Sequence, residues 1–307
     1  MKSVNRARLV TIATVAFVSV LLALALSACD VNGIVGIDGM SNLNYANASA
    51  YTVAERAELD AHSTVSEIEV DWINGNIQVE YLESAAAVDF YEVAEGEEVT
   101  EDTTMHYLLD NGVLRIKYAK PGKFKNGNLR KKLYINLPRN LTLSKLDIES
   151  VNGNVNVNCN LGAVDIENYN GNITVAGTAT KVDVESFNGN IVVDSNASIV
   201  DIESGNGSIE VNGTVSYIDI ESANGNITVA CTQALMELDI NNAYGNVNLN
   251  IAEERGFRLE YETISGKMSS SFSGQLTMQG RVYVYLGGGA AIDVETASGS
   301  LSLGTLQ

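Results

Sequence analysis

Residues 164–175 read VDIENYNGNITV, and five near-copies of this phrase flank them. The copies are LDIESVNGNVNV (146–157), VDVESFNGNIVV (182–193), VDIESGNGSIEV (200–211), IDIESANGNITV (218–229) and LDINNAYGNVNL (238–249). Successive copies begin 18 residues apart, except for one interval of 20. A short, fixed period with strand-like alternation inside it is typical of a stacked repeat protein.

Within each copy, aliphatic and polar residues alternate on both sides of an Asn-Gly turn. In the copy at 164–175, Val164, Ile166, Ile173 and Val175 are expected to point inward and Asp165 outward. The four inward positions are aliphatic in every copy, and each buried aliphatic side chain contributes about 1.5–3 kcal/mol. The pattern predicts an all-β fold, a parallel β-solenoid with two facing sheets and about 18 residues per coil. The alternative, a sandwich of antiparallel hairpins, would not need matching residues at a constant offset.

The sequence around the regular array predicts four segments. Residues 1–28 form a signal segment, and residues 29–63 are a polar tether. Residues 64–145 contain an early copy of the repeat with inserted antiparallel strands, because Asp110-Asn111-Gly112 is a strong hairpin signal. Residues 146–303 form the β-solenoid repeat domain, with atypical copies toward its end.

The N-terminus has the pattern of a secretory signal. Basic residues at the start lead into an apolar run and then into Leu26-Ser27-Ala28-Cys29. This tetrapeptide resembles the lipobox of bacterial lipoproteins, which implies cleavage before Cys29 and acylation of that residue. The protein is therefore expected outside the cytoplasm, attached to a bacterial membrane by the lipid on its cysteine. An ordinary signal peptide and an uncleaved anchor helix remain the alternatives.

Composition limits the partners and the chemistry. The chain has 19 basic and 38 acidic residues, a formal net charge of −19, which argues against nucleic acid as a partner. His62 and His106 are the only histidines, and no nucleophile or phosphate-loop motif is present, so no enzymatic activity and no cofactor are predicted. Cys159 and Cys231 occupy the same position of coils four repeats apart, about 19 Å, so they are not expected to form a disulfide.

Two outward positions of the repeat are acidic in nearly every copy. Stacking would align them in two rows on one face: Asp147, Asp165, Asp183, Asp201, Asp219 and Asp239 in one, and Glu149, Glu167, Glu185, Glu203 and Glu221 in the other. Such rows are costly because like charges face each other across strands. They are read in three ways: a solvated face that prevents lateral pairing, a site for divalent cations such as calcium, or a docking surface for a cationic partner.

One basic segment interrupts the acidic background between Arg115 and Lys145. It is interpreted either as a solvated hairpin that pairs with its neighbours or as a contact surface. The second reading involves anionic lipid, an envelope polymer or the acidic rows of another copy. The candidate contact residues are Lys123, Lys125, Arg130, Lys131 and Lys132.

The repeated phrase D-[IV]-E-[ST]-x-[NS]-G-[NS]-[IVL]-x-[VL], preceded by Leu137-Pro138, resembles the bacterial putative-adhesin β-strand-repeat family, a domain of unknown function. The resemblance covers most of residues 64–303 and implies a right-handed β-solenoid that is exported or attached to the envelope. It transfers no catalytic residue. The function expected is a non-catalytic, adhesin-like or scaffolding role in which the acidic rows face a partner or divalent cations. The alternative is an envelope-stress or sensory accessory protein that binds a specific protein.

Overall fold

The computed structural model describes residues 45, 47–59, 64–96, 98–121, 129–231, 235–252, 256–272 and 276–306. The signal segment, Cys29, Lys123 and Lys125 lie outside these residues. The described chain forms two compact units that divide between Asn188 and Gly189. We call the residues up to 188 the N-terminal unit and those from 189 the C-terminal unit.

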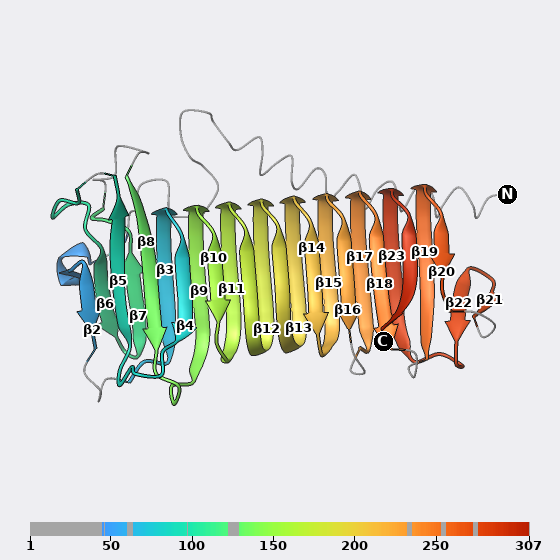
Figure 1. Cartoon of the computed structure of the whole chain (residues 1–307), viewed down its shortest axis with the longest axis horizontal. Helices are drawn as coiled ribbons and strands as arrows, with labels where there is room; N and C mark the ends of the chain where they lie inside the picture. The colour runs from blue at the N-terminus through green and yellow to red at the C-terminus, as the bar shows by residue number, and fades with distance from the viewer. Residues whose placement is uncertain are drawn as a thin grey trace. The chain divides into compact units, whose positions relative to one another are not determined.

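The described N-terminal unit consists of strands and connecting turns, apart from a 3-10 helix at Ala48–Ala50 (Figure 1). Its strands are β1 (Thr52–Val53), β2 (Arg56–Glu58), β3 (Glu67–Asn74), β4 (Ile77–Tyr81), β5 (Asp89–Glu95), β6 (His106–Asp110), β7 (Val113–Lys117), β8 (Arg130–Leu137), β9 (Leu143–Asn152), β10 (Val155–Asn158), β11 (Leu161–Asn170) and β12 (Ile173–Asn188).

The repeats of this unit stack in parallel and in register. Strand β11 pairs with β9 on one side and with the second half of β12 on the other, so that Asp165 lies opposite Asp147 and Asp183. The first half of β12 pairs in the same way with β10. The inward aliphatic side chains, such as Ile166 and Ile173, are buried. The all-β, mostly parallel solenoid predicted from the repeat is therefore confirmed.

The order of coils at the outer end of the N-terminal unit differs from the order in the chain. Strands β3 and β4, the early copy, lie between β9/β10 and β7/β8. The outermost coil, β7/β8, is then covered by the antiparallel strands β6 and β5. Strands β1 and β2 pair with β6 and β5, so residues 52–58 of the segment predicted as a tether belong to this sheet structure. These antiparallel strands pair with the edges that the last parallel coil would otherwise expose.

The described C-terminal unit contains only strands and turns (Figure 1). The strands are β13 (Ile191–Asn206), β14 (Ile209–Gly213), β15 (Val215–Asn224), β16 (Ile227–Cys231), β17 (Glu237–Tyr244), β18 (Val247–Ala252), β19 (Phe257–Ser265), β20 (Met268–Ser270), β21 (Thr277–Gln279), β22 (Val282–Tyr285), β23 (Ala290–Ser298) and β24 (Leu301–Leu306).

The C-terminal unit has the same architecture, and at its end the order of the coils again differs from their order in the chain. The coils β13/β14, β15/β16 and β17/β18 stack in chain order, but β23/β24 comes next and β19/β20 lies outside it. The antiparallel hairpin β21–β22 covers the first half of β19. Phe257, Phe272 and Tyr285 pack together at this end, with ring centroids 4.7–5.3 Å apart.

Asparagine side chains connect the turns of neighbouring coils. In the N-terminal unit, Asn170 Nδ2 donates to Asn152 Oδ1 (3.0 Å), and Asn188 Nδ2 donates to Asn170 Oδ1 (2.9 Å). In the C-terminal unit, Asn224 Nδ2 donates to Asn206 Oδ1 (3.2 Å). The Asn170 amide is both donor to one coil and acceptor from the next, which suits an array of identical turns.

Candidate functional site

The acidic rows predicted from the sequence are present in each unit as ladders of carboxylates in strand register. In the N-terminal unit the ladder of Asp147, Asp165 and Asp183 is extended by Glu69 of β3. The neighbouring ladder of glutamates is extended by Asp71. The predicted ladders did not include Glu69 and Asp71, although both residues are acidic and occupy the two ladder positions of the early copy of the repeat.

Basic side chains neutralise much of the N-terminal ladder. Lys145 Nζ lies 2.6 Å from Asp147 Oδ2 and 3.0 Å from Asp165 Oδ2, and Lys181 pairs with Asp183. Both lysines stand two residues before a ladder aspartate, on the same outward side of the strand. Beyond β3, Arg115 and Lys117 of β7 pair with the acids of that strand.

Glu149 is the carboxylate of this unit whose proton affinity changes most clearly. Burial raises its pKa to about 7, and the nearby Asp71, Glu167 and Asp147 raise it further, while Lys117 acts in the opposite sense. A carboxyl group that titrates near neutrality marks the place where charge is least well solvated.

The ladders of the C-terminal unit continue beyond the residues predicted. Asp201, Asp219 and Asp239 are followed by Asp293 of β23 and then by Glu260 of β19. The second ladder runs through Glu203, Glu221, Asn241, Glu295 and Glu262. Because β23 lies between β17 and β19, Asp293 rather than Glu260 is beside Asp239.

From Asp219 onward, the described part of the C-terminal ladders holds far less positive charge. Arg281 pairs with Glu262 at 3.2 Å, but no Lys or Arg in the described part of the chain pairs with Asp219, Asp239 or Asp293. Burial raises the pKa of Asp219 and of Asp293 to about 6, and repulsion from Asp239 and other acids adds to both shifts. Burial also raises the pKa of Asp239, of Glu221 and of Glu295.

Where the N-terminal unit has Lys145 and Lys181, two residues before a ladder aspartate, the C-terminal unit has Ile199, Tyr217, Glu237 and Ala291, and Arg258 takes this position only in β19. Ile199 and Tyr217 lie opposite each other, two residues before Asp201 and Asp219, and are 40% and 44% exposed. Tyr217 Oη lies 3.4 Å from Sδ of Met236, which is also exposed. We call Asp219, Asp239, Asp293, Glu221 and Glu295, with this apolar border, the C-terminal acidic face.

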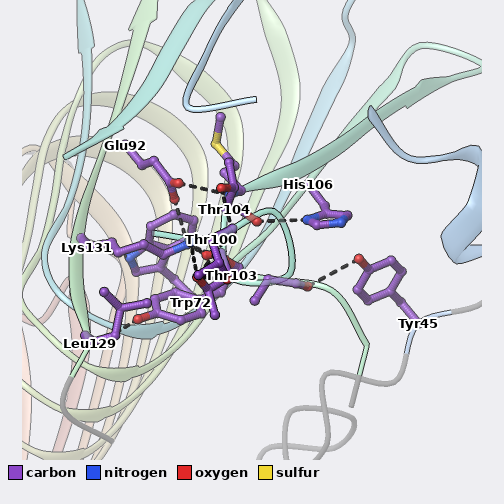
Figure 2. A network of polar contacts seen from close by, with 12 residues as sticks. Tyr45, Trp72, Glu92, Thr100, Thr103, Thr104, His106, Leu129 and Lys131 are labelled. Carbon is purple, nitrogen blue, oxygen red and sulfur yellow. Dashed lines mark hydrogen bonds and ion pairs between the residues drawn. The ribbon is translucent and has the colours of Figure 1, made fainter. Parts of the chain in front are cut away.

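The basic segment requires one correction. Lys131 is completely buried and cannot contribute to an exposed contact surface. Its Nζ lies 2.7 Å from Glu92 Oε2 and donates to the carbonyl oxygens of Thr103 (2.6 Å) and Tyr118. Figure 2 shows this ammonium group among Glu92, Trp72 and the loop that carries Thr103. Burial lowers the pKa of Lys131 to about 8 and raises the pKa of Glu92.

The reason for the correction is strand alternation in β8. Arg130 and Lys132 point outward, whereas Lys131 points to the same side as Leu133 and Ile135. Lys132 pairs with Glu95 at 2.6 Å, and Arg130 approaches the same carboxylate at 4.0 Å. These pairs favour the interpretation of the segment as a hairpin that is neutralised by its neighbours.

The two described cysteines are buried, and the described residues form no cluster suited to a metal ion. Cys159 and Cys231 are free, as predicted, and burial raises the pKa of each thiol to about 12. No group of three or more His, Cys, Asp or Glu side chains within the described residues could hold a metal ion. Over the same residues, no helix is long and apolar enough to cross a membrane.

Comparisons with known proteins identify the family. Three bacterial crystal structures each match 82% of the chain. A "putative adhesin" from Bacteroides fragilis is 14% identical over 96% of its own length, with a TM-score of 0.40, and a "putative lipid binding protein" from Parabacteroides distasonis is 15% identical over 96% of its length, with a TM-score of 0.39. A "putative cell adhesion protein" from Clostridium sporogenes is 11% identical over 98% of its length, with a TM-score of 0.29. No curated protein matches the sequence. The Toastrack DUF4097 family model matches residues 64–304, which confirms the resemblance drawn from the repeat. The chain belongs to the Toastrack DUF4097 family.

Proposed function

We propose that this protein is a non-catalytic, adhesin-like component of the bacterial envelope whose C-terminal acidic face binds a cationic partner. One observation carries the proposal: Asp219, Asp239 and Asp293 stand in register on adjacent strands without a paired lysine or arginine among the described residues.

The energetic argument rests on repulsion between neighbouring coils. Strands about 4.8 Å apart bring like charges to a distance at which each pair repels by about 0.9 kcal/mol in water and by more where solvent is partly excluded. The N-terminal unit reduces this repulsion with Lys145 and Lys181. A partner with several cationic groups would do the same for the C-terminal acidic face, and its binding would stabilise the folded protein.

The surroundings of the two free thiols and of His106 support a non-catalytic role. Both thiols are buried, with pKa values raised well above neutrality, so neither is activated as a nucleophile. His106 is buried, its Nδ1 lies 2.8 Å from Thr104 O, and burial lowers its pKa. We therefore propose recognition rather than turnover as the work of this surface.

Spermine, a flexible tetra-amine, is a suitable probe of the acidic face. Bound spermine stabilises the folded protein by RT ln(1 + c/Kd), where c is the free spermine concentration, and we expect each kcal/mol of this stabilisation to raise Tm by about 2–4 °C. A triple variant, Asp219→Asn, Asp239→Asn and Asp293→Asn, should lose most of this shift. The matched control carries Asp147→Asn, Asp165→Asn and Asp183→Asn and should keep it, because those acids already pair with lysines.

Sodium chloride at the same ionic strength separates specific binding from screening. Equal spermine shifts in the two triple variants would contradict the assignment of binding to the C-terminal acidic face. Calcium titration of the same three proteins decides whether a divalent cation replaces the amine.

The location is proposed from the N-terminal sequence. We expect the full chain, expressed in a bacterium, to incorporate a labelled fatty acid at Cys29, because the lipobox directs acylation there. The Cys29→Ser variant should incorporate none, and the matched Cys231→Ser variant should be labelled like the wild type. Label that persists in Cys29→Ser, or its absence from the wild type, would refute the lipid anchor.

The apolar border of the acidic face favours a second candidate, an envelope-stress or sensory accessory protein that binds one specific protein. Ile199, Tyr217 and Met236 expose hydrophobic area that a simple cation or a polyamine would not use. Photo-crosslinking from position 217 in the native host separates the two functions. A single protein adduct supports the accessory role, whereas adducts to polysaccharide support adhesion.

A further inference from the structure

The core of each unit contains a row of polar side chains. They come from the fifth residue of the repeated phrase, directly after the residue that belongs to the second outward ladder. The members are Ser150, Asn168 and Ser186 in the N-terminal unit, and Ser204, Ser222, Asn242 and Thr296 in the C-terminal unit. All are at least nine-tenths buried. A polar row inside an aliphatic core needs hydrogen-bond partners.

The two asparagines of the row show what this position requires. Asn168 Nδ2 donates to the carbonyl oxygens of Gly153 and Gly171, both at 3.1 Å. In the other unit, Asn242 Nδ2 donates to Gly225 O and Gly245 O at 3.1 and 3.2 Å. In each case the two acceptors belong to the turns of adjacent coils. One donor group with two hydrogens therefore satisfies a pair of turn carbonyls.

The first coil meets the same requirement with a different residue. Trp72 lies in register with Ser150, and its Nε1 donates to Lys131 O at 2.6 Å. Lys131 O occupies the place of a turn-glycine carbonyl, since it lies 2.1 Å from where a Cβ on Gly75 would be, as Gly153 O does for Gly171. Three residues in two units thus direct an N–H donor at this point.

The serines do not make this contact. The hydroxyl oxygens of Ser150, Ser204 and Ser222 are buried and have no hydrogen-bond partner among the described residues. Serine has two heavy atoms fewer than asparagine, and its Oγ takes the place of the asparagine Cγ, one bond short of the amide nitrogen, so the hydroxyl does not reach the turn carbonyls while the strand register is unchanged. Two lost heavy atoms correspond to about the space that one water molecule occupies.

We propose that each of these serine coils binds one ordered water molecule between the serine hydroxyl and the two turn carbonyls, displaced from the place of the asparagine amide nitrogen so that it lies at hydrogen-bond distance from all three oxygens. The water donates one hydrogen to each of two adjacent turn carbonyls and accepts the hydroxyl hydrogen of the serine. At Ser204 the two carbonyls are those of Gly189 and Gly207. Three polar partners are typical of a buried structural water. Asparagine and serine are then two solutions to one requirement of the repeat.

A crystal structure at about 1.2 Å resolution tests the water site at Ser204 directly. We expect a density peak within about 2.7–3.2 Å of Ser204 Oγ, Gly189 O and Gly207 O. A map with no density peak at this position would overturn the proposal. An anomalous peak that appears when potassium is replaced by rubidium would overturn it as well, because the ligand would then be a cation.

Two variants provide an independent measurement. Ser204→Asn brings its own amide and keeps both hydrogen bonds to the turn carbonyls, but it also buries an Oδ1 of the kind that has no partner at Asn168 and Asn242, so Tm should stay close to that of the wild type. Ser204→Ala removes one of the three partners of the water and should lower Tm by about 2–4 °C. The matched control, Ser198→Asn, places the same amide at an exposed position of the same unit and should leave Tm unchanged. A Ser204→Ala protein as stable as the wild type would contradict the water site.

Discussion

Replacement of Lys131 by alanine is expected to lower the free energy of unfolding by about 3–5 kcal/mol, because it leaves the buried Glu92 carboxylate without its counter-ion. The ammonium group also connects strand β8 to the loop at Thr103 and stands over two aromatic rings, 4.0 Å from the centroid of Tyr118 and 5.1 Å from that of Trp72. Its removal breaks several contacts of the outermost coil at once.

Urea unfolding followed by tryptophan fluorescence measures this effect locally, since Trp72 is the single tryptophan of the chain. The matched control is Lys132→Ala, which removes a solvent-exposed ion pair with Glu95 and should leave the free energy of unfolding nearly unchanged. The double variant Lys131→Met, Glu92→Leu should recover most of the loss, because it removes both buried charges. Equal costs for the two alanine variants would contradict a structural role for the buried pair.

Substitution of Gly171 by alanine is expected to cost about 3–5 kcal/mol. Its backbone has φ of +139°, a region that residues with a side chain rarely adopt. A Cβ at this position would lie 2.1 Å from the carbonyl oxygen of Gly153 in the neighbouring coil. Because the obstacle is backbone, relief of the clash requires the coils to separate.

Gly96→Ala is the matched control for this substitution. Gly96 also has a positive φ, of +92°, but a Cβ there would meet no atom within 4 Å. It should therefore show only the conformational cost, about 1–2 kcal/mol. Both glycines belong to the N-terminal unit, so the same fluorescence experiment reports on both. A Gly171→Ala protein no less stable than Gly96→Ala would refute the close stacking of turns.

The repeat made the regular coils predictable because each position has one physical role. The glycine spacing set the coil length, and the alternation around Val164 and Ile166 identified the buried side of the strands. The ends were not predictable in the same way. Nothing local in Ile292 or Leu259 indicates that β23 lies between β17 and β19, since that order depends on which coil closes the core.

The candidate site was predicted in part. The ladder positions followed from the repeat, but their electrostatic contrast depended on residues two positions earlier, where lysines such as Lys145 and Lys181 give way to Ile199 and Tyr217. The prediction that Lys131 is exposed was wrong because three consecutive basic residues in β8 were all treated as surface residues, although strand alternation places the middle one inside. Leu133 and Ile135 continue the inward side of that strand and already contain the signal that Lys131 is buried.

The titration of the C-terminal carboxylates tests the central claim most directly. If Asp219 and Asp293 stand in register on a face poor in cations, carboxyl carbon NMR should give apparent pKa values of about 6 for both. Because the folded-state pKa is raised above the unfolded value of about 3.9, the folded state binds protons more tightly. Stability should therefore increase as pH falls from about 7 to 4. Midpoints near 3.9 for both residues would show that these side chains do not share one crowded face, and would contradict the account.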